Sequence, residues 1–425
     1  MSTKSEGSDP QLQRRLGVFD AVVIGLGSMI GAGIFAALGP AAAAAGSGLL
    51  AGLAVAAVVA YCNATSSARL AAQYPQSGGT YVYGRERLGD FWGYLAGWAF
   101  VVGKTASCAA MALTVGAYTW PTHARAVAVA AVVALTAVNY RGVQKSALLT
   151  RVIVAIVLAV LALVVVISLS SGHAEVGRLD IGADITVGGV LQAGGLLFFA
   201  FAGYARIATL GEEVRDPART IPRAIPLALG ITLVVYATVA VAVLSVLGTE
   251  RLGSSTAPLV DAARAAGAAW LVPVVQVGAA IAALGSLLAL VLGVSRTTLA
   301  MARDHHLPHV LAAVHPRFKI PHRCELAVAA VVVVVTATVD VRGAIGFSSF
   351  GVLIYYGIAN AAAWTLTRDM GRPARVVPVV GLAGCVVLAF ALPLVSVVTG
   401  AGVIAVGALI YVLRQALTSR STRAH

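Results

Sequence analysis

Two positively charged side chains lie inside long apolar stretches of the sequence. Lys104 lies near the middle of the stretch 91–118, and Arg206 lies toward the end of the stretch 187–210. Because a charge is costly to bury in an apolar environment, such residues mark sites that recognise a charged ligand or carry a proton. The alternative is that a long side chain extends to a polar interface. That alternative fits Arg206 as well as a functional role does, but it does not fit Lys104, which is far from both ends of its stretch.

Glycines gather in two of the apolar stretches. The motifs VIGLGSMIGAGIF at residues 23–35 and FFAFAGYARIATLGEE at residues 198–213 place glycines where a helix would have to continue. A helix that breaks inside a bilayer bares amide and carbonyl groups, which must line a wet cavity or meet a ligand. The half-helix that starts near Gly33 suits a carboxylate, and the carbonyls near Met29 suit an ammonium group. With the same arrangement repeated around Phe199 and Gly203, the two breaks suit an α-amino acid zwitterion.

The first glycine motif fits three alternatives less well than it fits a broken helix. A dinucleotide-binding turn needs an acidic residue about 20 positions after its glycines, but the next carboxylate after Asp20 is Glu86. A cleaved signal peptide is unnecessary, because many further apolar stretches follow. A lone glycine in a membrane helix often serves only close packing, as we expect for Gly97 and Gly285. Clusters at two corresponding positions favour broken helices instead.

The composition indicates a membrane protein. Hydrophobic residues make up 59% of the 425 residues and charged residues only 11%, whereas soluble domains have about 25% charged residues. Apolar stretches of about 20 residues, enough to cross a bilayer, recur along the chain, and we expect about twelve all-α spans. They lie near residues 19–45, 49–72, 91–118, 124–140, 147–170, 187–210, 224–247, 270–301, 326–339, 344–366, 376–398 and 400–417.

The basic residues predict which side of the membrane each loop faces. With the N-terminus inside, about twenty Lys and Arg residues lie in inner segments and about five in outer ones, a strong positive-inside bias. An even number of spans then places the C-terminus inside as well. The net charge of +13 is therefore a topology signal and not a sign of nucleic-acid binding. We expect Arg296, near the end of its span, to extend to the interface.

The two glycine-broken spans are the first and the sixth, which predicts an internal repeat. Because five spans is an odd number, the second set of five starts from the opposite side of the membrane, and broken helices in such an inverted repeat mark the binding site. We expect a mobile tail at residues 1–13 and a ten-helix core at 14–370. The core divides into repeats at 14–171 and 186–370, and two additional spans with a tail follow at 371–425.

Four segments resemble the amino acid–polyamine–organocation (APC) superfamily. GSMIGAGIF at residues 27–35 is similar to its G-x-x-I-G-A/S-G-I-F signature. Residues 198–225, which continue as GEEVRDPARTIPRAI, resemble its sixth span and the following loop. YPQSGGTYVYGRERLGDFWGYLAGW at 74–98 and SRTTLAMARDHHLP at 295–308 resemble its second-to-third connection and the end of its eighth span. The resemblance covers residues 18 to 321 and implies a LeuT-like fold and secondary transport of amino acids or related amines.

The resemblance also implies roles for individual residues. The substrate carboxylate would meet the amides of Ala32 and Gly33, and the ammonium would meet carbonyls of Met29, Phe199 and Ala202. Together with the two glycines at the breaks, the expected site comprises Met29, Gly31, Ala32, Gly33, Phe199, Ala202 and Gly203. Phe199 or Phe201 would close over the substrate, although ordinary packing explains either ring equally well.

The sequence departs from the APC pattern in its fifth span. Many members place a lysine there in the position of a coupling sodium ion, whereas this chain has Val157 nearby. Lys104 can supply that positive charge instead, or Lys104 and Arg206 can complement an anionic group of the substrate. Glu212 and Glu213 follow the sixth span, and we interpret them either as an inner gate or as part of a solvated loop.

These observations predict a permease of the cell membrane. We expect secondary active transport by alternating access, coupled to protons, with no cofactor, metal ion or nucleic acid, by a monomer or weak homodimer. An exchanger and a non-transporting amino acid receptor remain alternatives on the same fold. An enzyme is disfavoured, because no intramembrane His–carboxylate cluster and no G-x-S-x-G elbow occurs.

Overall fold

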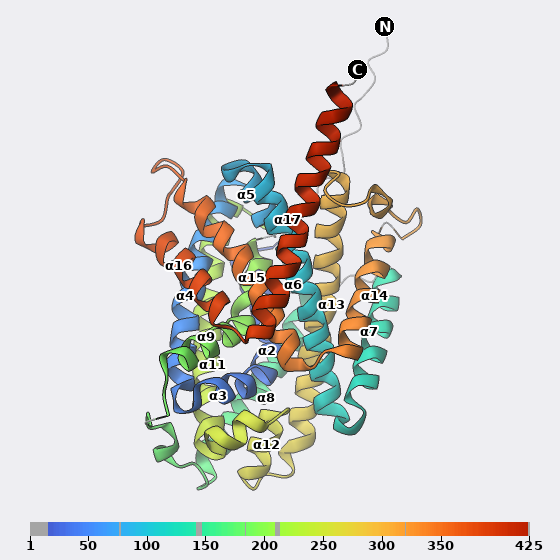
Figure 1. Ribbon diagram of the computed structural model, residues 1–425. Coiled ribbons are helices and arrows are strands. Elements are labelled where there is room, and N and C mark those ends of the chain that lie inside the picture. The colour runs from blue at the N-terminus through green and yellow to red at the C-terminus, as the bar shows by residue number, and fades with distance from the viewer. Residues whose placement is uncertain are drawn as a thin grey trace.

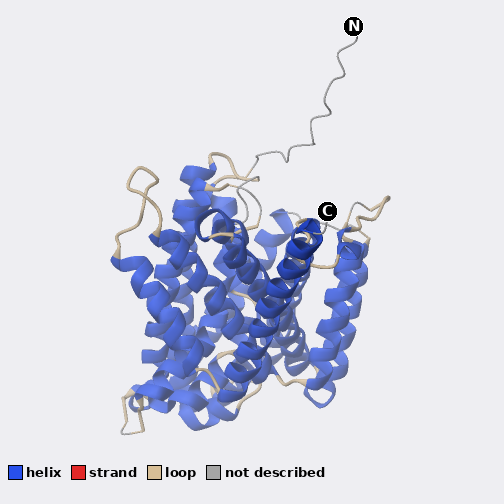
Figure 2. Cartoon of the chain, turned by 45° about the horizontal axis from the view of Figure 1, so that its top comes forward, coloured by secondary structure: helices blue, strands red, loops and turns tan. Residues whose placement is uncertain are grey.

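The computed structural model describes residues 16–75, 78–141, 147–182, 184–208, 213–318 and 320–423. Within these ranges the chain is helical throughout, apart from loops and a single isolated β-bridge between Leu16 and Val214 (Figure 2). The helices run side by side as one bundle, and α17 projects from it at one end (Figure 1). This confirms the predicted all-α polytopic architecture.

The first half of the chain contains α1 to α8. Their bounds are α1 Val18–Met29, α2 Ala32–Ala36, α3 Leu38–Ala45, η1 Gly46–Gly48, α4 Leu49–Gln73, α5 Thr80–Leu88, α6 Asp90–Thr119, η2 Pro121–His123, α7 Ala124–Tyr140 and α8 Ala147–Ser170. α2 and α3 together form one bent half-helix, because Pro40 has no N–H to donate to the carbonyl of Ala36. The amide of Ala37 still donates to Gly33, and that of Ala41 to Ala37.

The second half and the two additional helices follow. Their bounds are η3 Val176–Leu179, α9 Val187–Phe201, η4 Ala202–Tyr204, α10 Ala205–Ala208, α11 Pro217–Ser254, α12 Pro258–Ala265, α13 Leu271–Arg303, η5 His309–Ala312, α14 His322–Thr338, α15 Val341–Trp364, α16 Val376–Ala391 and α17 Leu394–Arg423. In the described ranges, 10 stretches are long and apolar enough to cross a membrane. α14 and α16, with 17 and 16 residues, occupy the expected ninth and eleventh positions.

The boundary between the last two helices lies earlier than the sequence suggested. We expected the eleventh span to reach residue 398 and the twelfth to begin at 400, but α16 ends at Ala391. Leu392 is extended, with φ −60° and ψ 163°, and Pro393 accepts hydrogen bonds from the amides of Ser396 and Val397. Pro393 therefore opens α17, as a residue without an N–H readily does at the first turn of a helix.

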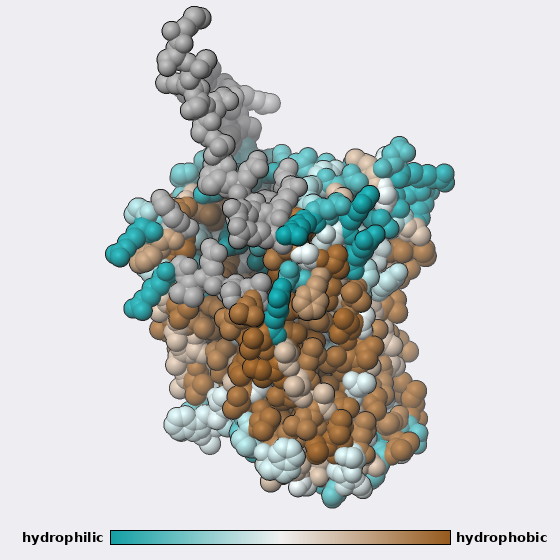
Figure 3. Space-filling model, turned by 180° about the vertical axis from the view of Figure 1, so that it is seen from behind, coloured by the Kyte–Doolittle hydropathy of each residue, from teal (hydrophilic) through white to brown (hydrophobic). Residues whose placement is uncertain are grey.

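The outer surface of the bundle matches a bilayer. Large exposed apolar side chains cover the outward faces of the helices, among them Val133, Leu148, Val166, Val234, Val277, Val334, Val395 and Leu409. They form a hydrophobic band between two more polar ends (Figure 3). Four exposed tryptophans lie at helix ends, Trp92 and Trp364 toward α5 and Trp120 and Trp270 toward α12, as expected for residues at the membrane–water interface.

The order of elements in the first half recurs in the second half with the opposite orientation along the bundle. A helix interrupted in its middle precedes α4 in the first half and α11 in the second. The short helix α5 then follows α4, and the short helix α12 follows α11. α5 and α12 lie at opposite ends of the bundle (Figure 1), which is what an inverted repeat requires. The residue limits 14–171 and 186–370 for the two repeats remain a prediction.

Candidate substrate site

Both glycine-rich spans are interrupted where the sequence predicts. In the first, α1 ends at Met29 and α2 begins at Ala32. Ile30, with φ −80° and ψ 51°, and Gly31, with φ −100° and ψ −139°, lie outside the helical region. In the sixth, α9 ends at Phe201 and tightens into η4 before the short helix α10. Each break bares backbone groups in the middle of the bundle.

The glycines at the breaks let the two interrupted spans touch backbone to backbone. A Cβ atom on Gly203 would lie 2.3 Å from the carbonyl oxygen of Ser28, and one on Gly33 would lie 2.6 Å from the Cα of Ala200. A Cβ on Gly31 would lie 2.1 Å from Oγ of Ser286. Since real Cβ atoms do not approach other atoms so closely, no larger residue fits at these positions without displacing its neighbours.

The bared carbonyls of the first break are paired with side chains of neighbouring helices. The Tyr236 hydroxyl on α11 lies 2.6 Å from the carbonyl oxygen of Met29 and 3.0 Å from that of Ala200. The Ser286 hydroxyl donates to the Gly27 carbonyl at 3.3 Å. The bilayer core offers no water to these groups, so such partners are needed. The Met29 carbonyl, which we expected to meet a substrate ammonium, is therefore already bound by Tyr236.

A cavity of about 170 Å³ lies between α6, the α9–α10 segment and α13. It is smaller than the roughly 300–1,000 Å³ of pockets for drug-sized ligands, so it suits a small substrate. Six of the expected functional residues line it, namely Lys104, Phe199, Ala202, Gly203, Arg206 and Glu213. Five others do not, namely Met29, Gly31, Ala32, Gly33 and Phe201. The sixth span thus contributes most of the expected site, and the first contributes Ser28.

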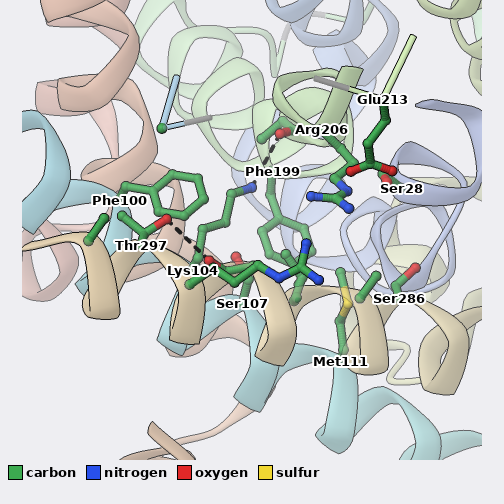
Figure 4. A pocket seen from close by; sticks show the side chains of 18 residues that line it. Ser28, Phe100, Lys104, Ser107, Met111, Phe199, Arg206, Glu213, Ser286 and Thr297 are labelled. Atoms are coloured by element: carbon green, nitrogen blue, oxygen red, sulfur yellow. Dashed lines mark hydrogen bonds between the residues drawn. The ribbon is translucent and has the colours of Figure 1, made fainter. Parts of the chain in front are cut away.

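Lys104 reaches the bared backbone of the sixth span. Its side chain is only 6% exposed, and its Nζ atom donates to the carbonyl oxygen of Ala202 at 3.2 Å (Figure 4). The Tyr356 hydroxyl on α15 donates to the same oxygen, also at 3.2 Å. Asn360, one turn further along α15, donates from Nδ2 to the carbonyl of Tyr356 and to Oδ1 of Asn63. The Ala202 carbonyl is therefore held by an ammonium of the protein itself.

Basic and acidic side chains meet at the end of the cavity nearer α5. Arg206 and Glu213 point toward one another across it (Figure 4). Glu213 is fixed through its backbone, because its carbonyl accepts from the amide of Leu16 at 3.1 Å, and the Leu16 carbonyl accepts from the amide of Arg215 at 2.9 Å. Because the Arg206 side chain lines the cavity, it does not extend to an outer interface. Glu212, the other expected gate residue, lies outside the described residues.

Several cavity residues were missed by the sequence analysis. Arg296, which we expected to extend to the interface, is exposed and also lines the cavity. The signal that would have found it is helical spacing. One face of α13 lines the cavity, and its residues recur at the i, i+3, i+4 and i+7 positions of a helix: Ser286, Ala289, Leu290, Gly293, Arg296, Thr297 and Ala300. Phe100, Ser107 and Met111 on α6 follow the same spacing around Lys104.

The two candidate aromatic gates lie in different places. Phe199 lines the cavity. Phe201 is fully buried, and its ring centroid lies 5.1 Å from that of Tyr236. Of the two rings, only Phe199 is placed to touch a molecule in the cavity.

Outside the membrane, a polar cluster fixes α5 against the end of α13. The Tyr81 hydroxyl donates to Asp304 at 2.5 Å, and Arg85 donates to the same carboxylate at 3.0 Å. The His306 ring nitrogen Nδ1 lies 2.9 Å from the Tyr81 hydroxyl. Burial lowers the pKa of His306, and the nearby Asp304 carboxylate opposes this shift. The cluster therefore holds the end of the helix that carries Arg296.

A model of the amino acid permease family matches residues 16–416. The chain belongs to this family. It is 75% identical to an uncharacterized transporter of Mycobacterium tuberculosis, over 97% of this chain and 93% of that protein. It is 27% identical to a branched-chain amino acid permease of Bacillus subtilis, over 74% of this chain and 72% of that protein. A methylthioribose transporter of the same species is 28% identical, over 96% of this chain and 95% of that protein.

Membership of the amino acid permease family explains the architecture. The 10 long apolar stretches found in the described ranges, together with the family match, identify a multi-pass integral protein of the cell membrane. The relatives named for a substrate act on chemically different molecules: one on branched-chain amino acids, one on methylthioribose and others on cationic amino acids. At such identities the fold is shared, and the ligand depends on the side chains of the site.

Proposed function

We propose that this permease is a secondary transporter that carries amino acids across the cell membrane by alternating access. The observation that carries the proposal is the small cavity at the interrupted sixth span, where Lys104 and Tyr356 hold the bared Ala202 carbonyl. Backbone left unwound at membrane depth is characteristic of ligand sites in transporters. The amino acid class is supported by the family and by the branched-chain permease among the relatives.

The two interrupted spans are tied together at both membrane surfaces, which suggests where opening occurs. At the α5 face, Leu16 before α1 pairs with Glu213 and Arg215 after α10. At the α12 face, Ser47 after α3 donates from its hydroxyl and amide to Asp184 before α9, at 2.6 and 3.0 Å. In our mechanism these contacts break in alternation, so that the cavity opens to one side at a time. Glu213 and Arg206 form the gate at the α5 end.

We assign proton coupling to Lys104. When its amine is protonated, the ammonium holds the Ala202 carbonyl and keeps the sixth span in its present position. When the proton leaves Nζ to water on the inner side, that charge-assisted hydrogen bond weakens, and the segment is free to move. One proton taken up outside and released inside would then accompany each substrate.

The test is uptake of radiolabelled amino acids into proteoliposomes, with and without an inward proton gradient. We expect the gradient to stimulate uptake by the native protein. Lys104→Arg keeps a charge near Ala202 that cannot be released, so the sixth span should stay in its present position and uptake should be lost. Lys104→Met removes the hydrogen bond to Ala202 altogether, so the protein should still insert and any uptake that remains should not respond to the gradient.

Three results would contradict the proposal. Gradient-stimulated uptake in Lys104→Met that equals the native rate would remove Lys104 from the mechanism. Uptake that requires amino acid inside the vesicles and ignores the gradient would show an exchanger. Binding of an amino acid without any flux would show a receptor.

A further inference from the structure

The cavity carries an excess of positive charge. Lys104, Arg206 and Arg296 come from three different helices, and all line the same small space. Glu213 is the one carboxylate among the described residues that line it. If all four groups are charged, the three basic side chains and the one carboxylate give a net charge of +2.

Most of this excess cannot be removed by deprotonation. An arginine guanidinium stays protonated in proteins, whereas a lysine can release its proton. Even with a neutral Lys104, two guanidinium groups therefore face a single carboxylate. Arg206 and Glu213 point toward one another (Figure 4). Arg296 is therefore the guanidinium group that no carboxylate of the described cavity lining faces. Within the described part of the chain, no hydrogen bond or ion pair of Arg296 is found. Its side chain is exposed and lines the cavity, and Glu325 on α14 is close enough to interact with it electrostatically.

The other buried carboxylate near this helix does not change the conclusion. Glu325 lies in the first turn of α14 and is fully buried. It does not line the cavity, and neither of its oxygens has a hydrogen-bond partner among the described residues. If Glu325 is ionised as well, two carboxylates still face three basic groups. Counting the described residues, the cavity remains positive except when Lys104 is neutral and Glu325 is charged.

An ordinary zwitterionic substrate would not neutralise this site. Its carboxylate and ammonium cancel, and its ammonium would be repelled by the neighbouring bases. A cationic amino acid would add to the excess. A substrate with a second acidic group, in contrast, brings a net negative charge into a low-dielectric space where opposite charges attract strongly.

We infer that the substrate class of this permease is the acidic amino acids, with the side-chain carboxylate bound by Arg296 and by Arg206. This inference rests on the proposed transport function and deepens it. Arginine suits the role because its planar fork binds a carboxylate through two parallel hydrogen bonds. Phe100, Met111, Phe199 and Leu290 supply the apolar remainder of the cavity wall.

The experiment compares uptake of L-glutamate, L-aspartate, L-leucine and L-arginine into proteoliposomes, with thermal stabilisation of the detergent-solubilised protein as a binding readout. We expect the two acidic amino acids to be taken up and to stabilise the protein, and L-arginine to do neither. Arg296→Gln should lower the kcat/KM for L-glutamate at least about tenfold, the equivalent of one lost charge-assisted contact. Arg296→Lys should restore part of it.

Arg303→Gln is the matched control. Arg303 lies on the same helix, two turns further on, is exposed and does not line the cavity. This variant should transport L-glutamate like the native protein. Equal loss in both variants, or no loss in Arg296→Gln, would overturn the assignment of Arg296.

The outcomes separate this inference from the proposed function. Uptake of L-leucine or L-arginine without uptake of acidic amino acids would overturn the acidic substrate class and leave amino acid transport standing. No uptake of any amino acid by correctly folded protein would overturn both.

Discussion

The first interrupted span breaks at Ile30 and Gly31 with dihedral angles outside the helical region, whereas the sixth tightens into the 3₁₀ turn Ala202–Tyr204. The first break is closed by packing, since Tyr236 binds the Met29 carbonyl and Gly31 abuts Ser286. The sixth faces the cavity with most of its unwound segment. Two breaks with the same sequence signal therefore have different roles. The first break packs against neighbouring helices beside the cavity, and the sixth exposes its residues to the cavity.

Replacing a glycine at the contact between the two breaks should have the largest effect on transport. Gly203→Ala places a Cβ atom 2.3 Å from the Ser28 carbonyl oxygen, and backbone cannot yield as a flexible side chain does. We expect loss of uptake and a destabilisation of about 1–3 kcal/mol or more, measured by thermal unfolding. Gly230→Ala on α11 is the control, because nothing lies within 4 Å of its Cβ position. Normal uptake by Gly203→Ala would mean that the two spans do not touch as described.

Removing each aromatic ring of the sixth span in turn should distinguish a residue that stabilises the fold from one that contacts the substrate. Phe201→Ala empties a fully buried site beside Tyr236, so it should cost about 3–5 kcal/mol of stability. Phe199→Ala opens the cavity wall and should mainly raise KM for the substrate. Unfolding curves and uptake kinetics of both variants check this. The distinction fails if Phe199→Ala is the less stable of the two.

Removing one tyrosine hydroxyl at each break should have a smaller effect on stability, and it compares the two breaks directly. Tyr236→Phe leaves the Met29 and Ala200 carbonyls without their hydroxyl partner, and an unsatisfied buried polar group costs about 1–3 kcal/mol. Tyr356→Phe should cost less, because Lys104 still donates to the Ala202 carbonyl. Thermal unfolding of the two variants gives the order. The reverse order would indicate that Lys104 does not hold that carbonyl.

The contact between Ser47 and Asp184 at the α12 face should give the smallest effect. The Ser47 hydroxyl and then its amide lower the pKa of the Asp184 carboxyl in the folded protein. A lowered folded-state pKa means that the contact stabilises the fold above the ordinary aspartate pKa, and this stabilisation is lost as pH falls through the lowered value. At neutral pH, Asp184→Asn should lower Tm by less than about 2 °C.

Below the lowered pKa the difference in Tm between Asp184→Asn and the native protein should disappear, which a pH series of unfolding curves measures. A difference that persists at acid pH would show that the carboxylate charge is not what ties the two spans together.

The sequence by itself determined the membrane-spanning class, nearly all of the spans and both breaks. Each of these depends on local composition, because lipid requires long apolar helices and glycine weakens them at particular positions. It also singled out Lys104, since a charge in the middle of an apolar span has no local explanation. The Pro393 boundary was missed, although a proline that opens a helix is also a local signal.

Only the tertiary structure decided which of the expected residues face the cavity. Gly33 and Phe201 pack against neighbouring backbone and side chains, whereas Arg296, which we did not expect in the site, lines the cavity. The reason is physical: which face of a helix points inward depends on how it is rotated against helices far away in sequence. The partners of Ala202 lie 98 and 154 residues from it. No local pattern encodes such contacts, because they form only when the helices pack.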